Sequence, residues 1–165
     1  MTQKFSAPWG KGLIIMTIFA SAILLGLPIF VLIKDFSENA PLYVLIGVPL
    51  PIFIGCLLFT IRGYELSDNT LAVQRLIWKT KIDLQKLRDV KVNPDAMKKS
   101  IRTFGNGGLF SFSGLFKNSE LGSYRAFVTD LKKSVVLYFT NRTIVVSPDR
   151  PNEFAAMIKN MSRLS

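Results

Sequence analysis

The stretch RTFGNGGLFSFSGLFK, residues 102–117, has the composition of a loop that could bind a phosphate group. It contains four of the eleven glycines of the chain and four of its thirteen phenylalanines. A phosphate-binding P-loop needs Gly-Lys-Ser/Thr after its spacer, so that lysine and hydroxyl meet the phosphates and magnesium. That sequence is missing, and Phe110 takes the third glycine position of the dinucleotide fingerprint. We therefore predict no nucleotide site here.

The same stretch also has the composition of an interface. Aromatic side chains flanked by basic ones suit contact with a bilayer or a protein partner, and packing over the rest of the domain is the alternative. The candidate contact residues are Lys98, Lys99, Arg102, Phe104, Leu109, Phe110, Phe112, Leu115, Phe116 and Lys117. A second basic group, predicted on adjoining strands, could face an anionic surface or be an ordinary solvated face; it consists of Arg75, Lys79 and Lys81.

Residues for catalysis or metal binding are scarce. The chain has no histidine, which removes the commonest general base and the commonest metal ligand. The single cysteine, Cys56, lies in an apolar run and is expected to be a packing residue. The carboxylates Asp83, Asp89, Asp95, Glu120 and Asp130 show no paired spacing. We expect a protein that is not an enzyme and needs no metal or cofactor.

Two long apolar runs precede this region. Residues 13–33 and 42–61 are each about twenty residues without a charge, long enough to cross a hydrocarbon core of roughly 30 Å. They predict two transmembrane helices, bent by internal glycine and proline. A cleaved signal peptide, with Ala20-Ser21-Ala22 as its cleavage pattern, is the competing interpretation.

The basic residues near these runs predict the orientation. Lys4 and Lys11 precede the first run and Arg62 follows the second, whereas Lys34 in the short connection is offset by acids. Both termini are therefore expected in the cytoplasm. Phe5 is expected to anchor at the depth of the lipid headgroups.

The remainder predicts mostly β-strands. Turn residues Asp68-Asn69 separate two alternating runs, further strands are expected around 78–84, 88–92, 124–129, 135–140 and 143–147, and 102–117 interrupts the series. Apolar residues then recur at helical spacing from Phe154 to Leu164. The prediction is a small antiparallel β-barrel or sandwich of six or seven strands, capped by a C-terminal α-helix that hides sheet edges and buries its apolar face. The helix could instead lie on the membrane surface.

The net charge of the chain indicates which classes of binding partner to expect. The chain has 21 Lys and Arg against 11 Asp and Glu, with most of the surplus after residue 61. A basic domain beside a bilayer favours the anionic inner leaflet. No nucleic-acid-binding signature is present, so nucleic acid is not an expected partner.

Strands followed by Ser147-Pro148-Asp149-Arg150-Pro151-Asn152-Glu153-Phe154 and a helix, after the 102–116 stretch and two apolar runs, resemble a membrane-anchored bacterial pleckstrin-homology (PH) domain protein. The resemblance implies a PH-like fold without known catalytic activity. Eukaryotic PH domains often bind phosphoinositides through basic residues around the first hairpin loop. Here that loop carries Asp68 and no base, which argues against inositide recognition.

The expected organisation is an N-terminal tail with two transmembrane helices (1–62) and a cytoplasmic PH-like domain (63–165). It would be a multi-pass protein of a bacterial inner membrane and a non-enzymatic binding or scaffold module. The expected partners are the bilayer itself, a protein partner or further copies of the chain, and anionic lipid. The alternatives are an accessory subunit of a transport or secretion complex and, less favoured, a small membrane enzyme.

Overall fold

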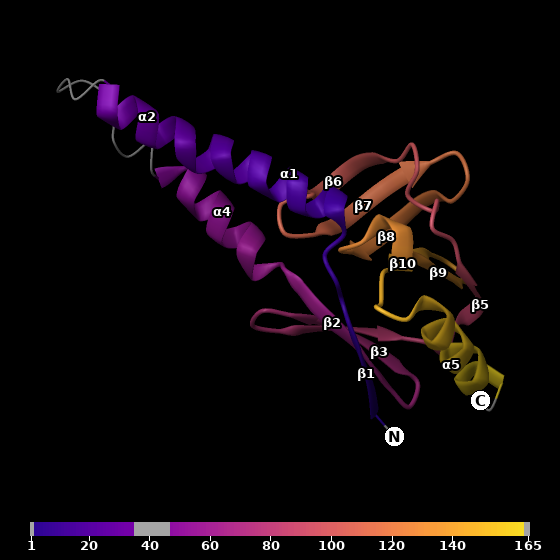
Figure 1. Ribbon diagram of the computed structural model, residues 1–165. Helices are drawn as coiled ribbons and strands as arrows, with labels where there is room; N and C mark the ends of the chain where they lie inside the picture. The colour runs from indigo at the N-terminus through magenta and orange to yellow at the C-terminus, as the bar shows by residue number, and fades with distance from the viewer. Residues whose placement is uncertain (1, 35–46, 164–165) are drawn as a thin grey trace.

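The computed structural model describes residues 2–34 and 47–163 of the chain. Two β-sheets pack face to face, and a long helical segment projects from one end of them (Figure 1). A C-terminal helix lies at the other end (Figure 1). The structure therefore contains a β-sandwich with an attached helical arm.

The smaller sheet has the strand order β1-β2-β3-β4 and is antiparallel throughout. Its strands are β1 (Thr2–Ser6), β2 (Ile61–Ser67), β3 (Thr70–Arg75) and β4 (Lys79–Asp83). The predicted hairpin turn is present between β2 and β3, where Asp68 adopts φ 44°. Alternation along β3 turns Leu71 and Val73 toward the other sheet and buries both completely.

The larger sheet has the order β5-β9-β10-β8-β7-β6. Its strands are β5 (Leu87–Val92), β6 (Ile101–Gly107), β7 (Phe112–Asn118), β8 (Gly122–Val128), β9 (Val135–Phe139) and β10 (Thr143–Val146). All pairs are antiparallel except β8 and β10, which run parallel, and a short 3-10 turn η2 (Leu131–Lys133) leads into β9.

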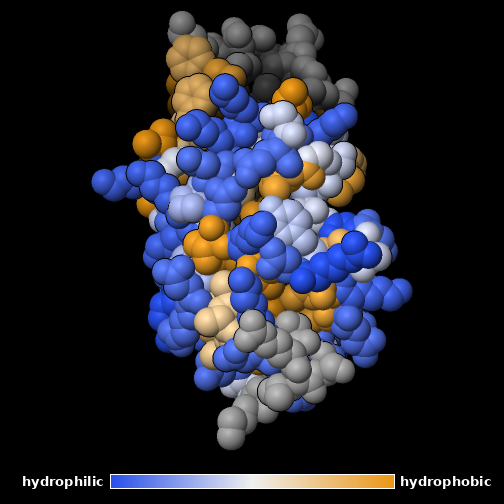
Figure 2. All heavy atoms as spheres, turned by 90° about the vertical axis from the view of Figure 1, so that its right-hand side faces the viewer, coloured by the Kyte–Doolittle hydropathy of each residue, from blue (hydrophilic) through white to orange (hydrophobic). Residues whose placement is uncertain are grey.

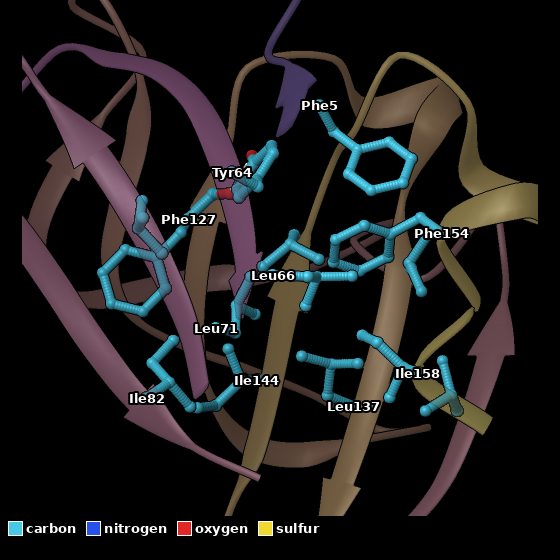
Figure 3. Packing of buried hydrophobic residues seen from close by; sticks show 14 of the residues in the cluster. Phe5, Tyr64, Leu66, Leu71, Ile82, Phe127, Leu137, Ile144, Phe154 and Ile158 are labelled. Atoms are coloured by element: carbon cyan, nitrogen blue, oxygen red, sulfur yellow. Dashed lines mark hydrogen bonds between the residues drawn. The ribbon is translucent and has the colours of Figure 1, made fainter. Parts of the chain in front are cut away.

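The core between the two sheets is held by apolar contacts and by a buried polar bridge at Tyr64 (Figure 3). Tyr64 of β2 is fully buried, and its hydroxyl donates to the Phe127 carbonyl of β8 at 2.6 Å. The same hydroxyl accepts the Ser147 backbone N–H at 3.0 Å. Burial raises the pKa of Tyr64 to about 12, against the lowering effect of the Ser147 hydrogen bonds. The neutral hydroxyl thus links the two sheets.

The C-terminal helix α5 (Pro151–Arg163) closes this core, as its spacing predicted. Phe154 and Ile158 are fully buried, and Phe154 packs edge-on against Phe5 with ring centroids 5.1 Å apart (Figure 3). Pro151 stands at the first helical position, where a missing N–H costs little.

The helical arm lies between β1 and β2 in the chain and begins at Lys11. Helix α1 (Lys11–Ser21), a π-helical turn η1 (Ala22–Gly26) and α2 (Leu27–Lys34) form one continuous helix. Helix α4 (Pro49–Leu58) returns beside it and contacts η1 (Figure 1). Within the described ranges one helix, Lys11–Phe30, is long and apolar enough to cross a membrane; by itself this is weak evidence for a span.

Several sequence predictions need correction. The described residues form ten strands, because the segment 102–117 is no interruption: it is most of the β6–β7 hairpin. The tail contributes β1, and Phe5 is only 2% exposed inside the sandwich, so its ring is a core residue and not a free interfacial anchor. The predicted span 42–61 extends too far at its C-terminal end, since α4 ends at Leu58 and Ile61 is a buried residue of β2. Residues 42–46 of that span lie outside the described residues, so a hairpin of two transmembrane helices is not established.

Candidate functional site

The predicted contact stretch divides into a buried part and an exposed part. Leu109, Phe110, Phe112 and Phe116 are each less than 10% exposed, so they pack within the protein. Phe112 and Phe116 join a second core on the outer face of the larger sheet, which Leu13 of α1 helps to cover. By contrast, Phe104 is 75% and Leu115 is 48% exposed.

The β6–β7 turn is fastened to the helical arm. The Thr17 hydroxyl of α1 donates to the Gly108 carbonyl and accepts the Phe110 N–H, both at 3.1 Å. Phe110 has φ 67°, an uncommon value for a bulky residue, and its ring packs against Phe53 of α4 at 5.2 Å and Trp9 at 6.1 Å between centroids. The phenylalanine at the turn therefore joins the sandwich to the arm.

The basic residues of the predicted contact stretch lie mostly away from the β6–β7 turn. Lys98 and Lys99 precede β6, and Lys117 pairs in register with Ile101 at the end of the hairpin opposite the turn. About six strand residues, or roughly 20 Å, separate the two ends. Arg102 folds its guanidinium over Gly107, nearer the turn. The buried phenylalanines near the turn are therefore separated from these lysines, whereas Leu115 and Lys117, two residues apart on β7, are both exposed.

The second basic group also divides. Lys79 and Lys81 are exposed on the smaller sheet, where Lys79 forms an ion pair with Glu65 at 2.6 Å. Hydrogen bonds from Lys79 and Gln74 lower the pKa of Glu65. Arg75 points to the opposite face and is only 7% exposed, so it is not part of that outer surface.

Arg75 is buried, and a buried guanidinium group needs hydrogen-bond partners to offset its loss of hydration. It donates to the Phe59 carbonyl at 2.7 Å, to the Ser113 hydroxyl at 3.0 Å and to the Thr80 hydroxyl at 3.2 Å. Its Cζ also lies 5.0 Å from the centroid of the Phe59 ring. No carboxylate of the described residues pairs with it, and burial, followed by the charge of Arg125, lowers its pKa.

A groove of about 590 Å³ opens beside Arg75. Its floor is the inner face of β6, β7 and β8 beyond the edge of the smaller sheet, and its wall is α4 with Phe59. Apolar and cationic side chains share the lining: Ile52, Phe59, Phe104, Leu115, Arg75 and Arg125 are among them. Both arginines lie near one ring, because the Cζ atoms of Arg75 and Arg125 are 5.4 and 5.0 Å from the centroid of Phe127.

Sequence reasoning missed Arg125 and misplaced Arg75, although a signal existed for both. Arg125 shares its strand face with Phe127, and Arg75 shares its face with Leu71 and Val73. An arginine at an inward position of an alternating strand is unusual, since charged side chains are seldom buried without a partner. Both predicted strands therefore already contained a cation on the inward face; the structure buries Arg75 there, whereas Arg125 stays exposed.

The described residues contain no cluster of three or more His, Cys, Asp or Glu side chains that could hold a metal ion. Asn106 closes the β6–β7 turn by accepting the Gly108 and Leu109 N–H groups, which is a structural use of its amide. The groove offers cations and apolar surface without a nucleophile–base pair.

A two-sheet β-sandwich closed by a C-terminal helix, with a cationic groove, defines a binding module of PH-like architecture. The chain belongs to the bacterial PH domain family: the model of this family matches residues 62–162, from within β2 to within α5. PH domains are typically non-catalytic binding modules. No curated protein and no solved structure matches the chain significantly.

Proposed function

We propose that the protein is a non-enzymatic binding module, held by its helical arm at the cytoplasmic face of a bacterial inner membrane, where its basic PH domain meets an anionic partner. The supporting observation is the contrast along the α1–α2 helix. Leu13 and Thr17 are buried against the domain, whereas farther along the helix Ile18, Phe19 and Ile33 are 65%, 68% and 76% exposed. Water disfavours such an apolar surface, and a bilayer removes it from water.

The alternative interpretations of this helix fit the structure less well. Only 11% of its most apolar window is buried, unlike the core helix of a soluble protein. A cleaved signal peptide would carry away β1, which pairs with β2 along its whole length and contributes Phe5 to the core. An uncleaved anchor keeps this strand in place.

The geometry of the arm supports an even number of crossings. Both the Lys11 end of α1 and the Phe59 end of α4 adjoin the same domain (Figure 1). A chain that crosses the bilayer through α1 and α2 must therefore cross back before β2. Lys4, Lys11 and Arg62, the positive residues near these ends, support a cytoplasmic location of the domain.

Helix length indicates how close the domain lies to the bilayer. About twenty residues are needed to cross the hydrocarbon core, so a span that ends near Ile33 begins near Ile14. Thr17 then lies in the first turn of that span, and the β6–β7 turn bonded to it lies at the membrane surface. The opposite face of the molecule, viewed from the α5 side, is mostly hydrophilic (Figure 2).

The anchor is tested by expressing the full chain with green fluorescent protein or alkaline phosphatase at its C-terminus. We expect the chain to resist carbonate extraction, with the fluorescent fusion active and the phosphatase fusion inactive. A carbonate-soluble chain, or an active phosphatase fusion, would contradict the proposal. The anionic partner is tested with the full chain in nanodiscs, by comparing copurified proteins and lipids at low and high salt.

A further inference from the structure

We propose that the groove between α4 and the β6–β8 strands binds one anionic phospholipid from the adjoining bilayer, with the phosphate at Arg125 and Arg75 and acyl chain against Phe59 and Leu115. The inference rests on the proposed membrane location. It adds a defined site and a class of ligand to that location.

Charge is the first reason. Arg125 makes no hydrogen bond or ion pair among the described residues, so all five of its N–H groups are available. Arg75 uses three donors on Thr80, Phe59 and Ser113, which leaves two. Two guanidinium groups over the same Phe127 ring, without a carboxylate, form a site that an anion would neutralise. Guanidinium groups bind phosphate oxygens with paired, charge-assisted hydrogen bonds.

Apolar surface is the second reason. A site for a free anion would need only polar walls, but this groove includes the side chains of Ile52, Phe59, Phe104 and Leu115. Leu115 and Phe104 are exposed although they lie on the inner face of their strands. A ligand with an apolar body beside its anionic group would cover both kinds of surface.

The position of the groove selects the phospholipid as the source of that ligand. Its wall includes Ile52, Gly55 and Cys56 of α4, a helix that contacts the candidate membrane helix at η1. The floor belongs to the same hairpin whose turn is bonded to Thr17. A volume of about 590 Å³ accommodates a phosphate and part of one acyl chain, within the usual range for ligand sites.

The test uses full-length protein, delipidated in a neutral detergent and titrated with phosphatidylglycerol or phosphatidylcholine, with adducts counted by native mass spectrometry. We expect one saturable phosphatidylglycerol adduct and at least tenfold weaker retention of phosphatidylcholine. Arg125→Gln should weaken phosphatidylglycerol retention by about tenfold or more, as expected for loss of a charge-assisted hydrogen bond. Arg142→Gln is the matched control, because Arg142 also lies 5.0 Å from a phenylalanine centroid but does not line the groove.

A second variant, Leu115→Asp, places a carboxylate directly across the strand pair from Arg125. It should abolish the adduct without lowering the melting temperature, because the new carboxylate takes the place of the lipid phosphate. The proposal would be overturned if the protein retained both lipids equally, or if Arg142→Gln weakened phosphatidylglycerol retention as much as Arg125→Gln. Complete displacement of the lipid by inorganic phosphate, or a protein dimer that carries no lipid, would also overturn it. Because lipid is added in detergent, failure here with intact membrane insertion rejects the groove assignment alone, whereas failure of insertion rejects the anchor.

Discussion

Thr17→Val tests whether the helical arm and the sandwich form one unit. Valine keeps the shape of threonine but removes the hydroxyl that bonds Gly108 and Phe110, so a buried carbonyl and a buried N–H lose their partner. An unsatisfied buried group costs about 1–3 kcal/mol. Relaxation of the strained φ of 67° at Phe110 would offset part of the combined cost of the two groups. The expected net loss of stability is therefore about 2–3 kcal/mol.

For a chain of this size a loss of that magnitude lowers the melting temperature by about 4–12 °C. The assay is thermal unfolding of the full chain in mild detergent, together with hydrogen exchange at the Phe110 amide. Thr17→Ser retains the hydroxyl and is the control, expected to melt near the wild type. If Thr17→Val melted like the wild type and Phe110 stayed protected, the hydroxyl would not join arm and sandwich and the reasoning would be refuted.

Two further predictions concern the sandwich. The pKa of Tyr64 is about 12 in the folded state, against 10.0 for an unperturbed tyrosine, so only the unfolded state ionises between these values. The wild type should therefore lose on the order of 3 kcal/mol of unfolding free energy as the pH rises through that window, and Tyr64→Phe should lack this component in denaturant titrations. Gly114→Ala should destabilise by about 2 kcal/mol or more in the same assay, because Gly114 has φ 152° and a Cβ there would overlap the Phe104 carbonyl of β6. Gly122→Asn is its control, with φ 66° in open space, and equal losses in both variants would exclude the overlap as the cause.

Secondary-structure elements were predicted correctly from the sequence where the signal lies in neighbouring residues. Alternating residues around Asp68-Asn69 identified the β2–β3 hairpin, and helical spacing after Pro151 identified α5 and the residues that it buries. These elements form from neighbours in the chain, so period and turn chemistry are sufficient to find them.

The elements that sequence analysis missed are those whose formation depends on contacts between distant parts of the chain. β1 is a short polar strand that exists because it pairs with β2, some sixty residues later, and no local signal distinguishes it from a tail. The β6–β7 hairpin was missed because its glycines indicate a loop, although Gly105 and Gly114 are there to let the two backbones approach. Their value is visible only once the pairing is known.

The groove shows why a candidate site can span the boundary of a matched domain. The sheet with β6 and β7 has six strands and the facing sheet has four, so part of its inner face lacks a partner sheet. Phe59 and the α4 residues Ile52 and Cys56 form a wall over that part, and all three lie outside residues 62–162. Arg75 connects the wall of the groove to its floor, because it donates hydrogen bonds to the Phe59 carbonyl and to the Ser113 hydroxyl. A fragment cut at the limits of the family match would keep both arginines but lose β1, Leu13 and this wall, so the site is a property of sandwich and arm together.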